Sequence, residues 1–188
     1  PTPNRPCKGL YLLDPEPFNW IYGQPERDRI AQLIQIYAPQ QTAASVAEHP
    51  QVLAEADVIL SGWGCPPLRR EFLEAAPNLK AVFYGAGSIR HIVTEEFWAR
   101  GIPICSAWAA NAVPVSEYTL SQILFALKSG WQHVAACRLE RRFVRLPLAG
   151  TFGSTVGLVS LGMVGRLVAE RLRSFDVHVI AYDPYVTP

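Results

Sequence analysis

The chain has 188 residues, of which 49% are hydrophobic, and a formal net charge of +1 at pH 7. This size and apolar content allow one large domain or two small ones with a buried core. The low charge excludes a global electrostatic field for nucleic acid or an anionic membrane, and no apolar run approaches the roughly 20 residues of a bilayer span.

Apolar runs alternate with helix-period segments in the first half of the chain. Four segments predict strands, at 9–13, 57–63, 79–87 and 102–107. Three segments predict helices, at 25–38, 69–76 and 94–100. Pro25 and Pro39 bound the first of these helices, while Thr94 can cap the last and Gly101 can end it. Continuous apolar strands between helices indicate a parallel sheet covered on both faces.

A long helix is predicted at 113–128, with Pro114 near its start and apolar residues along one stripe. The next stretch, 129–155, has a mixed pattern, and we expect an irregular arm. Residues 156–184 then follow the order strand, glycine turn, amphipathic helix, strand. We therefore expect an α/β fold with two domains, 1–108 and 109–188.

Small residues follow three of the strands in the first domain, in SGWG (61–64), YGAG (84–87) and SAWAAN (106–111). In open parallel sheets, ligands bind at the carboxyl ends of the strands, where small residues leave backbone N–H groups accessible. These turns are therefore candidates for a ligand site. The alternative is that the glycines only make tight turns.

The segment SLGMVG occupies the positions of a G-x-G-x-x-G turn, with Ser160 in place of the first glycine. Gly162 leaves the backbone open to a pyrophosphate, and Gly165 allows the helix to pack closely on the strand. Ser160 can replace glycine only with an ordinary φ, which we expect it to have. The amides of Met163 and Val164 should face the phosphates at the helix start.

Asp183 ends the strand that follows this helix. A carboxylate there can accept hydrogen bonds from both ribose hydroxyls of an adenosine and would repel a 2′-phosphate, which predicts NAD as the cofactor in preference to NADP. Its neighbours Tyr182 and Pro184 are included among the predicted cofactor-binding residues. The alternative is a βαβ unit with an incidental pair of glycines.

Three pieces of the chain together resemble the D-isomer-specific 2-hydroxyacid dehydrogenase family, which includes phosphoglycerate, glyoxylate/hydroxypyruvate and formate dehydrogenases. They are YGAGSIRHIV (84–93), ARGIPICSAWAANAVPVSEYTLSQILFALK (99–128) and the segment 156–184. The resemblance implies a flavodoxin-like parallel-sheet substrate domain followed by the first half of a Rossmann NAD-binding domain. It also implies an NAD-dependent oxidoreductase that transfers a hydride between the nicotinamide and C2 of a D-2-hydroxy acid or 2-keto acid.

The same resemblance assigns substrate-binding residues by position. It places the substrate carboxylate on the backbone amides of Ala86 and Gly87, Asn111 beside substrate and nicotinamide, and Trp63 in the wall of the substrate pocket. An aromatic wall favours an apolar or bulky substrate side chain over a phosphate. A packed surface Trp is the alternative. Met163 departs from the arginine often found in this turn of the family.

In the family, the catalytic Arg, acid and His lie in the later part of the cofactor domain and beyond. This chain holds two of the roughly six strands of a complete dinucleotide fold, so we expect no catalytic residue in it. The role is assigned to none of its histidines, which are His49, His91, His133 and His178, the last on a strand expected to be buried. We therefore expect a C-terminally truncated chain whose longer parent is the enzyme.

The stretch CRLERRFVRL (137–146) places four arginines among apolar residues. A nucleic-acid patch is one interpretation, but the low net charge favours an exposed arm or dimer contact, and the family pairs through this domain. We expect a homodimer with a small-molecule substrate and with no nucleic-acid or membrane partner. An NAD-sensing, corepressor-like binding protein on the same fold, as in the C-terminal-binding-protein relatives, is the alternative function.

The four cysteines, Cys7, Cys65, Cys105 and Cys137, stand far apart in the sequence. They form no CxxC or Cys/His pattern, which argues against a zinc site. Unpaired thiols are typical of a reducing compartment, and the apolar part of the N-terminal stretch is too short for a secretory signal. We therefore expect a cytoplasmic protein.

Overall fold

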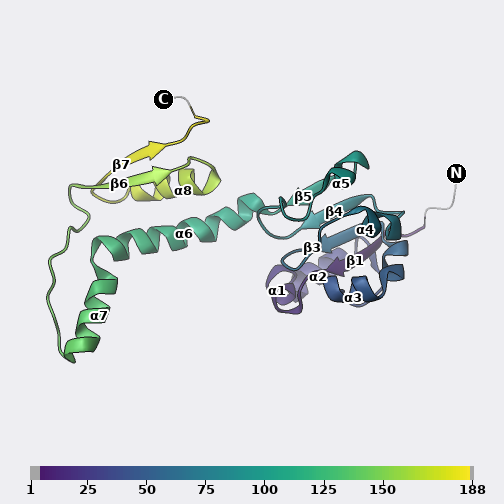
Figure 1. Ribbon diagram of the computed structural model, residues 1–188, viewed down its shortest axis with the longest axis horizontal. Helices are drawn as coiled ribbons and strands as arrows, with labels where there is room; N and C mark the ends of the chain where they lie inside the picture. Colours follow the sequence, from purple (N-terminus) through teal and green to yellow (C-terminus); the bar gives the residue numbers. More distant parts are fainter. Residues whose placement is uncertain (1–4, 187–188) are drawn as a thin grey trace. The chain divides into compact units, whose positions relative to one another are not determined.

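A five-stranded parallel sheet, in the order β2-β1-β3-β4-β5, forms the centre of the first of two units, Pro1–Trp108 and Ala109–Pro188. In this computed structural model, residues 5–186 are described. The strands are β1 (Lys8–Leu12), β2 (Gln35–Ile36), β3 (Val58–Ser61), β4 (Ala81–Tyr84) and β5 (Ile104–Ser106) (Figure 1). The predicted parallel α/β architecture is therefore confirmed.

Helices connect these strands, as the alternation in the sequence predicted. They are α1 (Pro15–Ile21), α2 (Gln24–Ala31), α3 (Ala43–Glu48), the 3-10 helix η1 (Pro50–Glu55), α4 (Arg70–Ala75) and α5 (Glu95–Ala99). The Thr94 side chain accepts a hydrogen bond of 3.2 Å from the N–H of Phe97 at the start of α5. Gly101, with φ of 64°, follows the end of that helix. Both predicted helix signals are confirmed.

The predicted helix at 25–38 is wrong in its second half, because α2 ends at Ala31 and Gln35–Ile36 form β2 beside β1. The reason lies across the sheet at Gly9, where a Cβ would overlap the side chain of Ile34 and come within 3.1 Å of Cδ1 of Ile36. Because Gly9 has no side chain, Ile34 and Ile36 can pack directly against β1. This long-range packing overrides the helical period.

Alternate residues of the central strands face opposite sides of the sheet. Leu10 and Leu12 pack into the larger core cluster, whereas Tyr11 and Leu13 pack against the side chains of α1 and α2. The expected cover on both faces is present over β1 and β3. It is incomplete over β4, where Phe83 is 46% exposed among the residues that the structure describes.

The second unit contains a two-stranded parallel sheet with one covered face (Figure 1). Its elements are α6 (Trp108–Leu127), α7 (Gly130–Glu140), β6 (Ser154–Val159), α8 (Met163–Leu172) and β7 (Val177–Tyr182). Val156 of β6 and Val168 and Leu172 of α8 are buried together, with side chains of α6 packed against them. The predicted strand, turn, helix and strand are therefore confirmed.

Two predictions for this unit are wrong. The long helix was predicted to begin at residue 113, but α6 begins at Trp108, so Pro114 lies inside it. Three alanines before Pro114 favour the earlier helix start. The stretch 129–155, expected to be irregular, contains α7. Apolar and polar residues are mixed around this helix and only Gly130 is buried, so no amphipathic period marks it in the sequence.

The uncovered face of the small sheet is apolar. Val159, Ile180 and Tyr182 are 87%, 62% and 68% exposed, respectively. His178 points to the same face and is also exposed, so its expected burial is wrong. Successive side chains of a strand point to opposite faces of the sheet, and α8 covers only one face. The apolar side chains on the other face are therefore exposed.

Candidate functional site

The turn between β6 and α8 differs from expectation at Ser160, whose φ is 81°. An ordinary φ was predicted, and the left-handed value costs a residue with a side chain roughly 1–2 kcal/mol. The conformation follows from two hydrogen bonds: Ser160 N–H donates to the carbonyl of Tyr182 at 2.8 Å, and Leu161 N–H donates to Oδ2 of Asp183 at 2.6 Å. The end of β7 thus imposes the reversal of the chain.

The two glycines of the turn have different surroundings. A Cβ on Gly165 would overlap the carbonyl oxygen of Ser160, so only glycine allows α8 to approach the turn this closely. A Cβ on Gly162 would meet only Oγ of Ser160, at 3.8 Å. Gly162 precedes the first residue of α8 and borders open space. A phosphate group fits at this helix start, because its N–H groups have no partner within the helix.

Asp183 lies at the tip of β7 and is half-buried. Its Oδ2 accepts the N–H of Leu161, and its Oδ1 accepts the N–H of Tyr185 at 2.8 Å. The bond from Leu161, followed by the bond from Tyr185, holds the pKa of the Asp183 carboxyl below its usual value. Oδ2 also has a weak contact of 3.5 Å with Oγ of Ser160, whereas Oδ1 keeps a second lone pair and can still accept a hydroxyl donor.

The structure brings the predicted cofactor-binding residues to one edge of the small sheet, where β6 and β7 both end. They are Ser160, Gly162, Met163, Val164, Gly165, Tyr182, Asp183 and Pro184. Met163 is 37% and Tyr182 is 68% exposed. The edge therefore combines accessible backbone N–H groups with a fixed carboxylate, which is a suitable arrangement for a diphosphate joined to a sugar.

The predicted substrate residues of the first unit lie at the carboxyl ends of β3 and β4. Gly85 N–H donates to the carbonyl of Ser61 at 2.8 Å, which joins the two strand ends. Ala86 is buried and Gly87 half-buried, and within residues 5–186 neither N–H donates a hydrogen bond. Trp63 is 47% exposed, so its ring is available to a ligand. Asn111 lies in α6 of the second unit and is half-buried.

The glycines of these turns also serve packing. A Cβ on Gly62 or on Gly85 would overlap the side chain of Ile21, at the end of α1. Gly64 has φ of 90°, and a Cβ on it would overlap the carboxylate of Asp14. The alternative reading, tight turns and close packing, therefore accounts for these three glycines. It does not account for the unbonded N–H groups of Ala86 and Gly87, which are suited to binding an anion.

Asp14 is a residue of this edge that the sequence motifs missed. It follows β1, and its N–H donates to the carbonyl of Trp63 at 2.9 Å. The only signal in the sequence is the Asp-Pro pair after an apolar strand, which marks a turn or helix start without indicating what lies beside it. The contact with Gly64 arises from the strand order, since β1 and β3 are neighbours in the sheet.

Within residues 5–186 the structure contains no membrane-spanning helix, no cluster of metal-binding side chains and no disulfide bond. No helix between residues 5 and 186 is long and apolar enough to cross a membrane. In the same range, no three His, Cys, Asp or Glu side chains gather closely enough to hold a metal ion. The cysteines Cys7, Cys65, Cys105 and Cys137 carry free thiols.

Comparison with known proteins supports the resemblance seen in the motifs. Residues 121–188 match the family model of the D-isomer specific 2-hydroxyacid dehydrogenase, NAD binding domain. A D-3-phosphoglycerate dehydrogenase of Mycobacterium tuberculosis is 38% identical over 120 residues, which are 63% of this chain and 22% of that protein. C-terminal-binding protein 1 of Caenorhabditis elegans is 32% identical over 146 residues, 73% of this chain and 20% of that protein.

Solved structures share the fold at low sequence identity. A glyoxylate reductase from Paecilomyes thermophila has a TM-score of 0.73 and 20% identity, with 98% of this chain and 58% of that chain covered. The NAD-dependent formate dehydrogenase from Staphylococcus aureus in complex with NAD has a TM-score of 0.64 and 22% identity, with 95% and 56% covered. The chain spans about a fifth of the length of the curated relatives described above.

Proposed function

We propose that this chain, whose family is that of the D-isomer-specific 2-hydroxyacid dehydrogenases, is part of an NAD-dependent oxidoreductase. The reaction is hydride transfer between the nicotinamide and C2 of a D-2-hydroxy acid or 2-keto acid. Residues 1–108 form the substrate domain, and residues 109–188 form the first part of the NAD-binding domain. The observation that carries the proposal is the open space at Gly162 together with the ionised carboxylate of Asp183.

In this proposal, the chain holds the cofactor by backbone and carboxylate groups. The N–H groups of Met163 and Val164, at the positive end of the α8 dipole, bind the diphosphate. Asp183 accepts the ribose hydroxyls and repels a 2′-phosphate, which makes NAD the preferred cofactor over NADP. Bound NAD supplies the hydride acceptor or donor.

For the substrate, the N–H groups of Ala86 and Gly87 receive the carboxylate. Trp63 borders the side-chain end of the site, and Asn111 is the candidate contact beside C2. We assign no proton donor and no orienting arginine within this chain. In this proposal the chain alone binds NAD but does not reduce 2-keto acids.

Titration of the chain with NAD tests the cofactor site. Gly162→Ala places a methyl group in open space, so the free energy of unfolding in urea should change by no more than about 1 kcal/mol. NAD affinity should fall by about tenfold or more, because the methyl group occupies the position of the diphosphate. Gly157→Ala in β6 is the matched control, since a Cβ there also meets nothing within 4 Å. Equal NAD affinity in both variants would contradict the proposal.

An NAD-sensing binding protein is the second candidate, supported by the similarity to C-terminal-binding protein 1. Absorbance of NADH at the nicotinamide band distinguishes the two functions. The complete protein should oxidise NADH with at least one 2-keto acid if it is a dehydrogenase. Tight NAD binding without turnover across a panel of 2-keto acids would favour the sensor.

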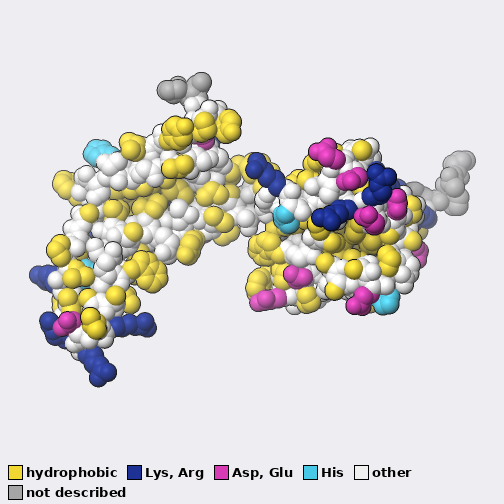
Figure 2. Space-filling view, viewed as in Figure 1, with side chains coloured by type: hydrophobic (Ala, Val, Ile, Leu, Met, Phe, Trp, Pro, Cys, Tyr) yellow, Lys and Arg dark blue, Asp and Glu magenta, His cyan; other side chains and the backbone are white. Residues whose placement is uncertain are grey.

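We further propose a cytoplasmic homodimer that pairs through α7 and the segment after it. This surface exposes Trp131, Leu139, Phe143 and Phe152, of which Leu139 is 83% exposed. Figure 2 shows basic side chains gathered at its end, and apolar surface with interleaved arginine is typical of interface cores. Sedimentation equilibrium should give a dimer, and Leu139→Glu should give a monomer. The free thiols support the cytoplasmic placement.

A further inference from the structure

We infer that the substrate site selects against negative charge: Asp14 and Trp63 form its side-chain end, which takes bulky uncharged groups and rejects a phosphate or second carboxylate. This inference rests on the proposed function, because it assumes that the substrate carboxylate lies on Ala86 and Gly87. It adds a substrate class and a specificity-determining residue, Asp14, which no motif indicated.

The strand order places the three loops in a row. β1, β3 and β4 are neighbours, so Asp14, Trp63 and Ala86 follow one another along the carboxyl edge of the sheet. Adjacent strands lie about 4.8 Å apart, which puts Asp14 roughly 10 Å from Ala86. The bonds from Asp14 N–H to the Trp63 carbonyl and from Gly85 N–H to the Ser61 carbonyl hold neighbouring loops together. A substrate anchored at Ala86 extends its side chain toward Trp63 and then Asp14.

Asp14 is exposed, with its carboxylate against one neighbouring residue. It rests against the backbone of Gly64, where any side chain would collide with it. Asp14 precedes α1 but makes no side-chain capping bond to that helix. Within residues 5–186 it has no ion-pair partner. Its negative charge is therefore without an ion-pair partner and lies beside Gly64, the residue after Trp63.

The same loops lack the groups that bind phosphate. Residues 13–22 and 61–68 contain Asp14 and Glu16 but no lysine or arginine, and Arg69 is the next residue after them. Arg27 of α2 packs on Phe18 and donates hydrogen bonds to Asn19 and Gln24, so its guanidinium is already engaged. Phosphate recognition in proteins uses arginine or lysine, or free N–H groups at a helix start. The start of α1 cannot supply such N–H groups well, because Pro15 and Pro17 have none. The exposed Trp63 instead offers an apolar face.

A further arginine follows the third strand of the row. Arg90 follows the β4 turn, and its N–H contacts Oγ of Ser88 at 3.4 Å. It therefore belongs to the loop proposed to hold the substrate carboxylate. The segment after β4 thus carries an arginine, whereas the segment after β1 carries Asp14 and Glu16. This differs from what a substrate such as D-3-phosphoglycerate requires, although relatives that bear its name are 38% identical over part of the chain.

The test compares kcat/KM of the complete protein for phenylpyruvate, 2-ketoglutarate and 3-phosphohydroxypyruvate. We expect the wild type to prefer phenylpyruvate over both anionic acids by about tenfold or more, given the repulsion between charges a few ångströms apart. Asp14→Lys should shift the ratio of anionic to uncharged substrate upward by about tenfold, with Asp14→Asn intermediate. Glu48→Lys, the same charge change at an exposed position of α3, should leave the ratio unchanged.

The outcomes separate the inference from the proposed function. A wild type that prefers the phosphorylated acid, or an Asp14→Lys ratio equal to that of Glu48→Lys, would overturn the inference while the dehydrogenase function stands. The absence of turnover with every 2-keto acid would overturn both. Urea unfolding of each variant shows whether the fold is intact. Asp14→Asn removes the charge but keeps the shape of the side chain. A changed substrate ratio in Asp14→Asn therefore cannot result from a loss of stability that only Asp14→Lys suffers.

Discussion

The carboxylate of Asp183 and the backbone N–H of Leu161 form a hydrogen bond of 2.6 Å that joins the tip of β7 to the turn before α8. A bond from N–H to a charged acceptor is roughly twice as strong as one between neutral groups. Asp183 therefore helps to shape the glycine turn in addition to its proposed role as the carboxylate that binds the ribose. Substitutions at this position act on both roles, and two different side chains are needed to separate them.

Asp183→Asn should retain the turn and change the cofactor preference. The amide oxygen of Asn can still accept the N–H of Leu161, although the bond from the N–H of Tyr185 is lost together with the negative charge that repels a 2′-phosphate. NAD affinity should fall, and the ratio of NADP to NAD affinity should rise by about tenfold, as measured by calorimetric titration. Asp183→Ala should weaken both cofactors further because the turn loses its acceptor. An unchanged preference in Asp183→Asn would count against the ribose assignment.

Gly165→Ala should destabilise the second unit. The added methyl group overlaps the carbonyl oxygen of Ser160, so α8 must move away from the turn. Overpacking of this kind typically costs about 1–3 kcal/mol. Urea unfolding followed by circular dichroism measures the loss, and Gly157→Ala, with open space at its Cβ, is the control. Equal stability of the two variants would show that the turn relaxes without cost.

Ser160→Gly should stabilise the protein. Ser160 has φ of 81°, which glycine adopts without steric penalty, so relief of about 1 kcal/mol is expected. The lost contact between Oγ of Ser160 and Asp183 is 3.5 Å long and therefore weak. Thermal unfolding measures the gain. A lower melting temperature for Ser160→Gly would mean that the hydroxyl contact outweighs the backbone strain.

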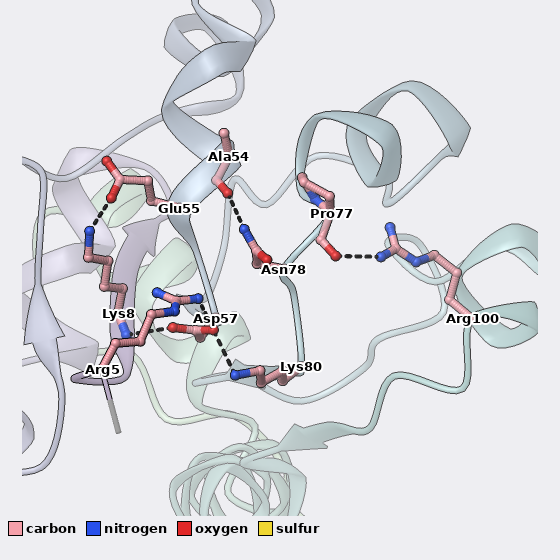
Figure 3. A network of polar contacts seen from close by, with 9 residues as sticks. All are labelled: Arg5, Lys8, Ala54, Glu55, Asp57, Pro77, Asn78, Lys80 and Arg100. Atoms are coloured by element: carbon pink, nitrogen blue, oxygen red, sulfur yellow. Dashed lines mark hydrogen bonds and ion pairs between the residues drawn. The ribbon is translucent and has the colours of Figure 1, made fainter. Parts of the chain in front are cut away.

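Asp57 forms the centre of a charged network at the amino ends of β1, β3 and β4 in the large sheet (Figure 3). Its side chain is only 1% exposed and lies 2.7 Å from Arg5 and 2.9 Å from Lys80. The N–H of Lys8 donates to its second oxygen at 2.9 Å. Burial opposes ionisation, but the Lys8 bond, followed by the contacts with Lys80 and Arg5, outweighs burial and holds the pKa of Asp57 below its usual value.

Asp57→Asn should lower the free energy of unfolding at neutral pH by about 1–2 kcal/mol, because buried polar partners lose a charged acceptor. The folded pKa lies below the unfolded value, so this contribution is complete above the unfolded pKa of about 3.9 and is lost as the pH falls through the folded pKa. Urea unfolding between pH 7 and pH 3 should therefore show a shallower acid decline in the variant. Glu55→Gln, in an exposed pair with Lys8, should change stability by about 1 kcal/mol at most.

The proposed substrate site at the carboxyl ends of β1, β3 and β4 was least predictable from the sequence. Ala86 and Trp63 could be named because the family resemblance assigns substrate contacts at their positions. Asp14 could not, because its contact with Gly64 joins segments that meet only after β1 and β3 pair. Likewise, the φ of Ser160 depends on bonds from the end of β7, which lies far along the chain.

The sequence by itself determined the type of most elements and the order of the glycine turn. Periods of two and of 3.6 residues, and caps such as Thr94, act within a few residues and are readable there. Only the tertiary structure decided that residues after Ala31 form a strand, that Ser160 is left-handed and that Asp14 borders Trp63. The physical reason is that each of these depends on packing or hydrogen bonds between distant segments, whose energies override local preference and leave no local pattern.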